Sequence, residues 1–598
     1  MQQPRRDHRR ARRDAAGAEA GRAADVDDLQ HRAWRPPLRP ADGRRHLRRF
    51  RRGLFRRPAD DFLRLARGCR RPLRRALRAG GEGPHRRDRS AGREARGGAL
   101  ASGRAPRVGL TVDPVAALLG RAGDRPEDPA VVQGGLTVTY GAFAERVMWL
   151  AGAFARAGEA PKVLIDLPQG ADAYAAMFAA LMAGGTYCPV NREAPAAAQE
   201  RVFRAFAPSV VATDAATGRR PWMEGAVLVD VAGCDASPLP APREPAEAAY
   251  VMFTSGSTGI PKGVVVPSAG LAHYCDWAAA FEAGPGDRWS QHPNIAFDLS
   301  VLDIYGALTR GASLHPPAGP ADRLMPGALA RRERLTIWNS VPTAIDLVVE
   351  ARQATAETFA SVRMASFCGE PLRGRHLRAL FEARPDMRVQ NTYGPTEATV
   401  SCTEVALDAA DFEALCRPVA SLGAAIPGME LHLIDGPDAD HGEIAIAGPQ
   451  VALGYLGDPA RTARSFPVVD LPDGRRLRVY RTGDLARREE GLLYFEGRAD
   501  RQVKITGHRI ELGEIDAAVE RLSGAPAASV VVNDRIVTFL ATAEGADSAA
   551  LRARLRDALP AYAVPTSIVP LAEFPRTPND KVDFEALTAM AGRGHAAA

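Results

Sequence analysis

The clearest chemical signal in the sequence is a loop of small and hydroxyl-bearing residues that precedes a lysine. Its members are Thr254, Ser255, Gly256, Ser257, Thr258 and Gly259, and Lys262 follows them. Glycine lets backbone N–H groups approach phosphate oxygens, hydroxyls add hydrogen-bond donors, and lysine adds a positive charge. The apolar run at residues 250–253 predicts a buried strand just before the loop. This order favours a phosphate-binding loop over a flexible linker, although the pattern GxxxxGK[ST] is absent.

Seven further segments surround this loop. They are residues 136–140 (LTVTY), 181–189 (LMAGGTYCP), 391–397 (NTYGPTE), 442–443 with 454–455 (GE and GY), 480–484 (YRTGD), 497–511 (GRADRQVKITGHRIE) and 575–583 (PRTPNDKVD). In their order, over roughly residues 108–590, they resemble the motifs of the adenylate-forming (ANL) superfamily. That superfamily includes acyl-CoA synthetases, luciferases and the amino-acid adenylation domains of nonribosomal peptide synthesis.

Lysine usage supports the same motifs independently. The chain has 74 arginines and only four lysines, which are Lys162, Lys262, Lys504 and Lys581. Three of the four lie inside the motifs. A compact ammonium and a planar guanidinium bind phosphate and carboxylate with different geometry. We therefore expect those three lysines to bind phosphate or carboxylate groups.

The resemblance implies an ATP site that also holds Mg²⁺. The loop and Lys262 would bind the β- and γ-phosphates, Thr396 the α-phosphate, and Glu397 the Mg²⁺ ion, a hard cation that prefers carboxylate oxygen. The residues expected to complete the site are Tyr393 at the adenine, Asp484 and Arg498 at the ribose, and Gly369, Glu370, Asn391 and Gly394 around them. The implied catalytic residues are Lys262, Thr396, Glu397 and Lys581.

The resemblance also implies a domain rotation between two half-reactions. Lys581 would bridge the substrate carboxylate and the α-phosphate in the first, and would leave the site in the second. Asp500 matches the hinge of the family, and Lys504 and Gly507 would face the thioester-forming site. Two positions depart from the family pattern, because Asp580 replaces a glycine and Phe584 replaces an arginine. These changes affect the expected loop geometry around Lys581.

Asp298 indicates which acid would be activated. In amino-acid-activating members an aspartate at this position pairs with the α-ammonium of the substrate, and a carboxylate opposite a fatty chain would be costly. The alternative is that Asp298 caps a helix. Alignment by motif gives the rest of the expected pocket as Leu299, Leu302, Asn339, Ser366, Cys368, Thr392, Val400 and Ser401. The sequence therefore favours a small α-amino acid.

The segment Cys368-Gly369-Glu370 resembles the D-alanine–D-alanyl carrier protein ligase family. A cysteine there would narrow the pocket, although a buried structural cysteine is the simpler alternative. Asn339 and Ser366 add polarity that alanine does not need, so serine, glycine and L-alanine stay open. No Gly-Gly-x-Ser motif follows Lys581. We therefore expect a separate carrier protein with a phosphopantetheine thiol as the acceptor.

The elements that position these residues are predicted to be α/β. Strands at residues 163–167 and 226–231 alternate with helices such as 173–183, and a small α+β region has strands at 529–532 and 536–541 and a helix near 548–558. We expect a large multi-layer core at residues 108–499 and a mobile domain at 500–598. Residues 1–107 would form a disordered basic extension, or a leader that the working enzyme lacks.

Charge and composition exclude several other classes. Residues 1–100 carry a net charge of +18, which leaves −11 for the remainder because the whole chain carries +7. Nucleic-acid binding by the main domain is therefore not expected. Neither a membrane span nor an export signal is predicted, so the expected location is cytoplasmic. The alternatives left open are a free-standing peptide-synthesis adenylation enzyme, an acyl-CoA ligase, a non-catalytic sensor of ATP or an amino acid, and a basic scaffold.

Overall fold

The computed structural model describes residues 112–595, except 215–217, 234–235, 255–260, 472–473, 543–546 and 578–581. These described residues belong to one unit, Arg64–Ala598. The loop from Ser255 to Gly259, the pair Asp580 and Lys581, and the basic segment 1–107 lie outside them. Predictions made for those positions stay predictions.

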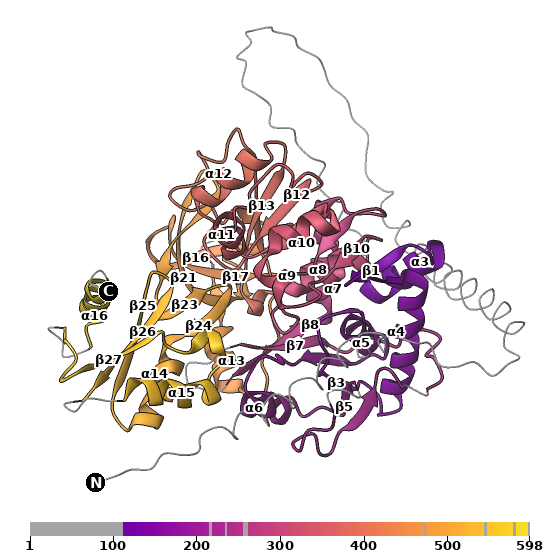
Figure 1. The fold of residues 1–598 in the computed structure, drawn as a ribbon, viewed down its shortest axis with the longest axis horizontal. Coiled ribbons are helices and arrows are strands. Elements are labelled where there is room, and N and C mark those ends of the chain that lie inside the picture. The colour runs from indigo at the N-terminus through magenta and orange to yellow at the C-terminus, as the bar shows by residue number, and fades with distance from the viewer. Residues whose placement is uncertain are drawn as a thin grey trace, which may run out of the picture. The chain divides into compact units, whose positions relative to one another are not determined.

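Two large sheets form the framework (Figure 1). The first has the order β15-β14-β13-β12-β11-β9-β10-β1-β2. In that order its strands are Ala424–Ala425, Thr403–Leu407, Arg388–Tyr393, Met364–Phe367, Ile337–Ser340, Arg288–Ser290, Ser313–His315, Pro129–Gln133 and Leu136–Thr139. The second has the order β18-β8-β7-β4-β3-β5-β6, with strands Gly454–Tyr455, Lys262–Pro267, Ala248–Thr254, Thr186–Pro189, Lys162–Ile165, Val210–Thr213 and Val227–Asp230. The central strands pair in parallel, as expected for an α/β fold.

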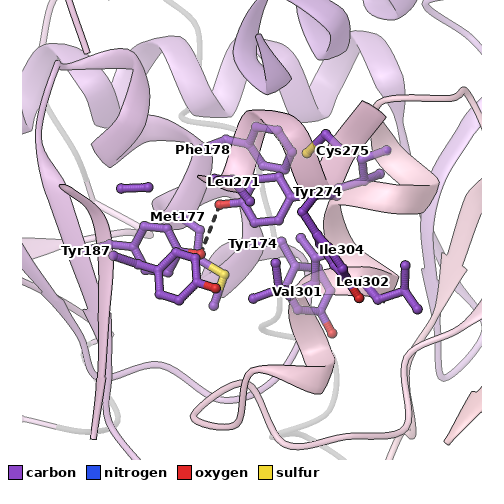
Figure 2. Close-up of a cluster of buried hydrophobic side chains, with 14 of the residues drawn as sticks. Tyr174, Met177, Phe178, Tyr187, Leu271, Tyr274, Cys275, Val301, Leu302 and Ile304 are labelled. Atoms are coloured by element: carbon purple, nitrogen blue, oxygen red, sulfur yellow. Dashed lines mark hydrogen bonds between the residues drawn. The ribbon is translucent and has the colours of Figure 1, made fainter. Parts of the chain in front are cut away.

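The main core lies where three helices pack between these sheets. Helix α5 (Ala171–Met182) contacts β3 and β4, whereas α8 (Leu299–Leu308) contacts β9 and β10, and α7 (Ser268–Trp277) contacts α8. Figure 2 shows aromatic and aliphatic side chains of these helices converging. Every residue of α8 is buried, and most of them are apolar, as expected for a helix enclosed on all sides.

Other helices cover the sheets or link their strands. They are α3 (Pro114–Asp124), α4 (Tyr140–Ala155), α6 (Ala196–Phe206), α9 (Pro320–Leu324), α10 (Pro326–Glu333), α11 (Thr343–Glu350), α12 (Gly374–Ala383) and α13 (Pro459–Ser465). Helix α3 begins at an N-cap in which Asp113 accepts from two backbone N–H groups and a proline opens the first turn. Local sequence therefore sets the start of the described fold.

Smaller sheets follow along the chain. A four-stranded sheet has the order β16 (Glu430–Asp438), β17 (His441–Ala447), β21 (Tyr480–Glu489) and β22 (Leu492–Arg498), and β19 (Val468–Asp470) pairs with β20 (Arg476–Arg478). Next come the hairpin β23 (Gln502–Ile505) and β24 (His508–Glu511), and a sheet of β25 (Ala527–Val532), β26 (Arg535–Ala541) and β27 (Ser567–Leu571). Helices α14 (Leu512–Ser523), α15 (Ser548–Ala558) and α16 (Phe584–His595) pack on it (Figure 1). This region has apolar clusters of its own, around Ile515 and around Leu587.

The expected α/β class is confirmed. The predicted helix at 173–183 is Ala171–Met182, the predicted strand at 226–231 is Val227–Asp230, and the helix expected near 548–558 is Ser548–Ala558. The apolar run at 173–190 divides into α5 and β4 instead of forming one long helix. In the described part of the chain, no helix has the length and apolarity needed to cross a membrane.

Candidate active site

The phosphate loop joins two neighbouring antiparallel strands. Thr254 ends β7, Lys262 begins β8, and the two residues are register partners. Residues 255–260 lie outside the described chain, but both ends of the loop are fixed by this pairing. The Lys262 ammonium lies 3.4 Å from Glu397 Oε1 and 5.3 Å from the centre of the Tyr455 ring. The predicted loop lysine and the predicted Mg²⁺ ligand are therefore neighbours.

Glu397 is a fully buried carboxylate surrounded by donors. Arg509 Nη1 lies 2.7 Å from its Oε2 atom, and the Tyr455 hydroxyl donates to Oε1 at 2.8 Å. Burial alone would raise the pKa of Glu397, but the positive charges of Arg509 and Lys262 outweigh it and hold the pKa well below its usual range. Glu397 is therefore ionised in this arrangement.

A single carboxylate fits Mg²⁺ that arrives with a nucleotide. No cluster of three metal-ligating side chains occurs among the described residues. Mg²⁺ is commonly held by one or two carboxylates together with substrate phosphates and waters. Glu397 matches that requirement, but Arg509 contacts its Oε2 atom here. Metal binding at this oxygen therefore requires Arg509 to move.

The predicted ribose residues form one hydrogen-bonded group. Tyr393 donates its hydroxyl to Asp484 Oδ2 at 2.5 Å, and Arg498 bonds Asp484 Oδ1 across β21 and β22. Arg498 also bonds the predicted hinge residue Asp500 through Nε at 2.6 Å. Burial would raise the pKa of Asp500, but Arg498 outweighs it and lowers that pKa. The expected hinge is thus joined to the expected ribose site.

The other residues predicted to bind ATP do not all line the same cavity. Gly369, Gly394, Thr396 and Lys504 line a small cavity with Asp298 and Arg498. Asn391 instead donates its side-chain amide to the Ser421 carbonyl at 2.8 Å, so it braces a loop. Glu370 accepts from the Thr343 hydroxyl at 2.6 Å and from the Gly507 N–H. Its carboxylate therefore links the core to the β23–β24 hairpin.

A cavity of about 290 Å³ lies beside this group. Four of the predicted substrate residues line it, namely Asp298, Leu299, Cys368 and Val400. The other five are buried beyond its wall: Leu302, Asn339, Ser366, Thr392 and Ser401. Ser401 lies within 3.7 Å of the Cys368 thiol and donates to Thr392 at 3.2 Å. The predicted pocket therefore has a lining layer and a deeper layer.

Asp298 does not act as the helix cap that was the alternative to substrate binding. It occupies the N-cap position of α8, but its side chain makes no capping hydrogen bond. Burial raises the pKa of Asp298, and the neighbouring Thr396 hydroxyl opposes that shift. Lys504 and Arg509 act on it only through longer-range charge interactions. A half-buried carboxylate at a cavity wall suits a cationic partner that arrives in the cavity.

The β23–β24 hairpin contributes cavity residues that the sequence did not single out. His508 stacks on Tyr562 with ring centroids 3.8 Å apart, and meets the edge of Phe297 at 4.9 Å. Burial lowers the pKa of His508 to about 4. His508 and Arg509 lie inside the motif at residues 497–511, so the sequence could have indicated them as site residues. Tyr562 lies in no motif, and only the fold brings it to the cavity.

A family model described as "AMP-binding enzyme" matches residues 119–456 of this chain. The chain belongs to this family. The match covers more than half of the sequence and includes both strands that flank the phosphate loop. The expected adenylate-forming, AMP-forming ligase of the acid–thiol type is therefore confirmed at the level of the family.

Curated relatives include carrier-protein ligases and peptide synthases. A D-alanine–D-alanyl carrier protein ligase of Listeria welshimeri is 31% identical over 446 residues, which cover 69% of this chain and 85% of the relative. A dimodular nonribosomal peptide synthase of Bacillus subtilis is 33% identical over 518 residues, or 79% of this chain. This chain spans only 21% of that synthase.

A solved structure shares the fold. The Vibrio cholerae adenylation domain AlmE, in complex with glycyl-adenosine-5′-phosphate, has a TM-score of 0.72 and 26% identity. The match covers 82% of this chain and the whole of that structure. The architecture described above is therefore that of an adenylation domain.

Proposed function

We propose that this protein activates a small α-amino acid, D-alanine or a similar one, with ATP and Mg²⁺. A carboxylate oxygen of the substrate attacks the α-phosphorus of ATP, the bond to the β-phosphate breaks, and pyrophosphate leaves. The resulting aminoacyl-adenylate then reacts with the phosphopantetheine thiol of a separate carrier protein, which forms a thioester and releases AMP. The observation that carries the proposal is Asp298, a half-buried carboxylate that lines the cavity with Thr396.

Each group has a defined task in the first half-reaction. Asp298 binds the α-ammonium, and this orients the substrate carboxylate toward Thr396 and Gly394. Lys262 offsets the charge of the phosphates, while Tyr393, Asp484 and Arg498 hold the nucleoside. Mg²⁺ at Glu397 would neutralise part of the phosphate charge. Both reactants are anions, so positioning and charge neutralisation account for most of the catalysis.

The hairpin contacts support the second half-reaction. Gly507 donates to Glu370, and Arg509 bonds Glu397. This arrangement suits the moment after pyrophosphate has left, because the Glu397 carboxylate then needs another cation. We infer that the described arrangement corresponds to the thioester-forming state.

The test is amino-acid-dependent exchange of pyrophosphate into ATP by the full chain. The panel contains D- and L-alanine, glycine, D- and L-serine, β-alanine and a short fatty acid. Exchange with an α-amino acid supports the proposal, and a preference for D- over L-alanine supports the carrier-protein ligase assignment. A preference for an L-amino acid favours the alternative, a peptide-synthesis adenylation enzyme, which the relatives support equally. Exchange with the fatty acid alone would contradict the role of Asp298 and favour an acyl-CoA ligase.

The acceptor is tested separately. Incubation with ATP, the preferred amino acid and a phosphopantetheinylated carrier protein should give an aminoacyl thioester on that carrier, detected by intact mass. Coenzyme A replaces the carrier in the parallel reaction. Faster transfer to coenzyme A than to any carrier would contradict the proposed partner.

A further inference from the structure

Arg501, the residue after the expected hinge residue Asp500, contacts three separate elements of the C-terminal region. Its Nη1 atom lies 2.9 Å from Asp516 Oδ2 on α14, and its Nη2 atom donates to the Ser529 carbonyl on β25 at 2.7 Å. Its guanidinium carbon lies over the Phe584 ring at the start of α16, 3.7 Å from the ring centre. One side chain therefore connects two helices and a strand.

The contacts of the chain change direction between these two neighbouring residues. Asp500 bonds Arg498, which belongs to the proposed ribose site and ends β22. Arg501 instead bonds residues that follow it in the chain. A rotation about Asp500 would therefore carry Arg501 together with α14, β25 and α16.

The guanidinium of Arg501 is oriented by its polar partners. Asp516 is buried, and its second carboxylate oxygen accepts from the Ser529 N–H at 2.7 Å. Burial raises the pKa of Asp516, and the charge of Arg501 opposes that shift. A planar guanidinium that is bonded along its edge can present its flat face to an aromatic ring. Asp516 and Ser529 thus set the direction of the stack on Phe584.

Phe584 lies close along the chain to the expected catalytic lysine. It comes three residues after Lys581, and three residues span at most about 10 Å. Val582, which follows Lys581 directly, pairs with Arg576 in an antiparallel bridge. Lys581 itself lies outside the described residues, but the chain that follows it is fixed by this bridge and by the Phe584 ring under Arg501.

We propose that Arg501 and Phe584 are positioning residues for Lys581. Their stack joins the segment that bears the lysine to the residue beside the hinge, so that a rotation about Asp500 returns Lys581 to the same place at the α-phosphate. An arginine at position 584 would meet Arg501 with a like charge, whereas the Phe584 ring offers it an attractive face. This inference rests on the proposed function, in whose first half-reaction Lys581 is expected to act.

The first experiment separates the ring face of Phe584 from its apolar packing. With the amino acid that the parent activates best, Phe584→Leu should lower kcat for pyrophosphate exchange by about 10-fold, because a small displacement of a catalytic group can cost about 100-fold. Phe584→Tyr keeps the ring face and should stay within about 2-fold of the parent. Phe574→Leu is the matched control, because Phe574 packs on the same apolar cluster but has no cation over its ring among the described residues. Equal losses in the two leucine variants, or in both variants of Phe584, would overturn the inference.

The second experiment compares the two half-reactions. Each variant is supplied with the preformed aminoacyl-adenylate and with the better acceptor of the carrier protein and coenzyme A, and thioester formation is followed by mass spectrometry. Phe584→Leu should match the parent within about 2-fold, because Lys581 is expected to have left the site in this half-reaction. Equal slowing of both half-reactions would indicate a general structural defect and overturn the inference.

The third experiment tests the other member of the stack. Arg501→Lys keeps the charge but loses the planar group that bonds Asp516 and faces the ring, so exchange should again fall by about 10-fold. The double variant with Phe584→Leu should lose no more than either single variant, because both changes remove one contact. Losses that multiply, or unchanged exchange in Arg501→Lys, would overturn the inference even if Phe584→Leu fails to fold. Exchange by the parent with no amino acid would instead overturn the proposed function itself.

Discussion

At the scale of single residues, the paired charges around Asp298 and Glu397 define the site. Glu397 forms ion pairs with Lys262 and Arg509, whereas Asp298 forms no ion pair with any residue that the structure describes. The two carboxylates therefore have different environments. The one without a close cation is the one that would receive the substrate amine.

Asp298→Asn should lower kcat/KM for the preferred amino acid on the order of 100-fold, since truncating one member of a buried charge pair costs 2–5 kcal/mol or more. Pyrophosphate exchange measures this loss, which should fall mainly on KM. Asp276→Asn is the matched control, because Asp276 is also a partly buried aspartate but bonds the Val112 N–H instead of lining the cavity. Loss of less than 3-fold in Asp298→Asn would contradict its assigned role.

His508 gives a pH dependence with a defined sign. Its folded pKa is about 4, compared with 6.5 for an unperturbed histidine. Between pH 6.5 and pH 4 the His508 imidazole is protonated in the unfolded chain but stays neutral in the folded protein. The contribution of His508 to the free energy of unfolding is therefore lost as the pH falls through this range. At pH 5 this amounts to about 2 kcal/mol. Urea unfolding at pH 7 and pH 5 should show the loss in the parent and a smaller loss in His508→Phe. The same pH dependence in both proteins would contradict this.

At the scale of elements, the turn of the β23–β24 hairpin is a close contact between the two regions of the chain. Gly507 has a φ of +76°, and a Cβ placed there would lie 2.7 Å from Val341 Cγ1. The same glycine donates to Glu370. A side chain at this position therefore pushes the hairpin away from the core.

Gly507→Ala should slow transfer to the carrier thiol by about 10-fold or more while pyrophosphate exchange changes less than 3-fold, because left-handed strain costs 1–2 kcal/mol before the clash is counted. Gly524→Ala is a matched control, because Gly524 has a φ of +75° but open space around it. The Gly524→Ala variant therefore has the backbone strain but no steric clash. Equal slowing of transfer in both variants would show that the contact with Val341 is irrelevant.

At the scale of the whole molecule, sequence and fold contributed different parts of the site. Local motifs predicted Lys262, Glu397, Asp484 and Arg498 as site residues, because each lies within a short segment with a recognisable pattern. The structure places Lys262 beside Glu397 and Arg498 beside Asp484. The contacts of Arg501 could not be predicted, because they reach α14, β25 and α16, which only the fold brings together. The pairing of Arg509 with Glu397 joins residues 112 apart, and no local pattern encodes it.

The role of the basic segment, residues 1–107, can be tested by comparing chains of two lengths. Residues 108–598 contain every residue that we place in the site, and their net charge is opposite in sign to that of residues 1–100. A chain that begins at Val108 should keep kcat/KM for pyrophosphate exchange within about 2-fold of the full chain. Activity that depends on residues 1–107 would favour the scaffold alternative. Purified protein of both lengths, compared at equal concentration, decides this.

Because this sequence contains few lysines, chemical labelling of amines can report on the active site. Each of the three described lysines lies over an aromatic ring: Lys162 over Phe206 at 4.8 Å, Lys262 over Tyr455 at 5.3 Å and Lys504 over Tyr393 at 5.7 Å. Tyr393 belongs to the proposed nucleotide site, Tyr455 bonds Glu397 there, and Phe206 ends helix α6. Amine acylation followed by peptide mass spectrometry should therefore show protection of Lys262 and Lys504 by ATP, with Lys162 as an internal reference.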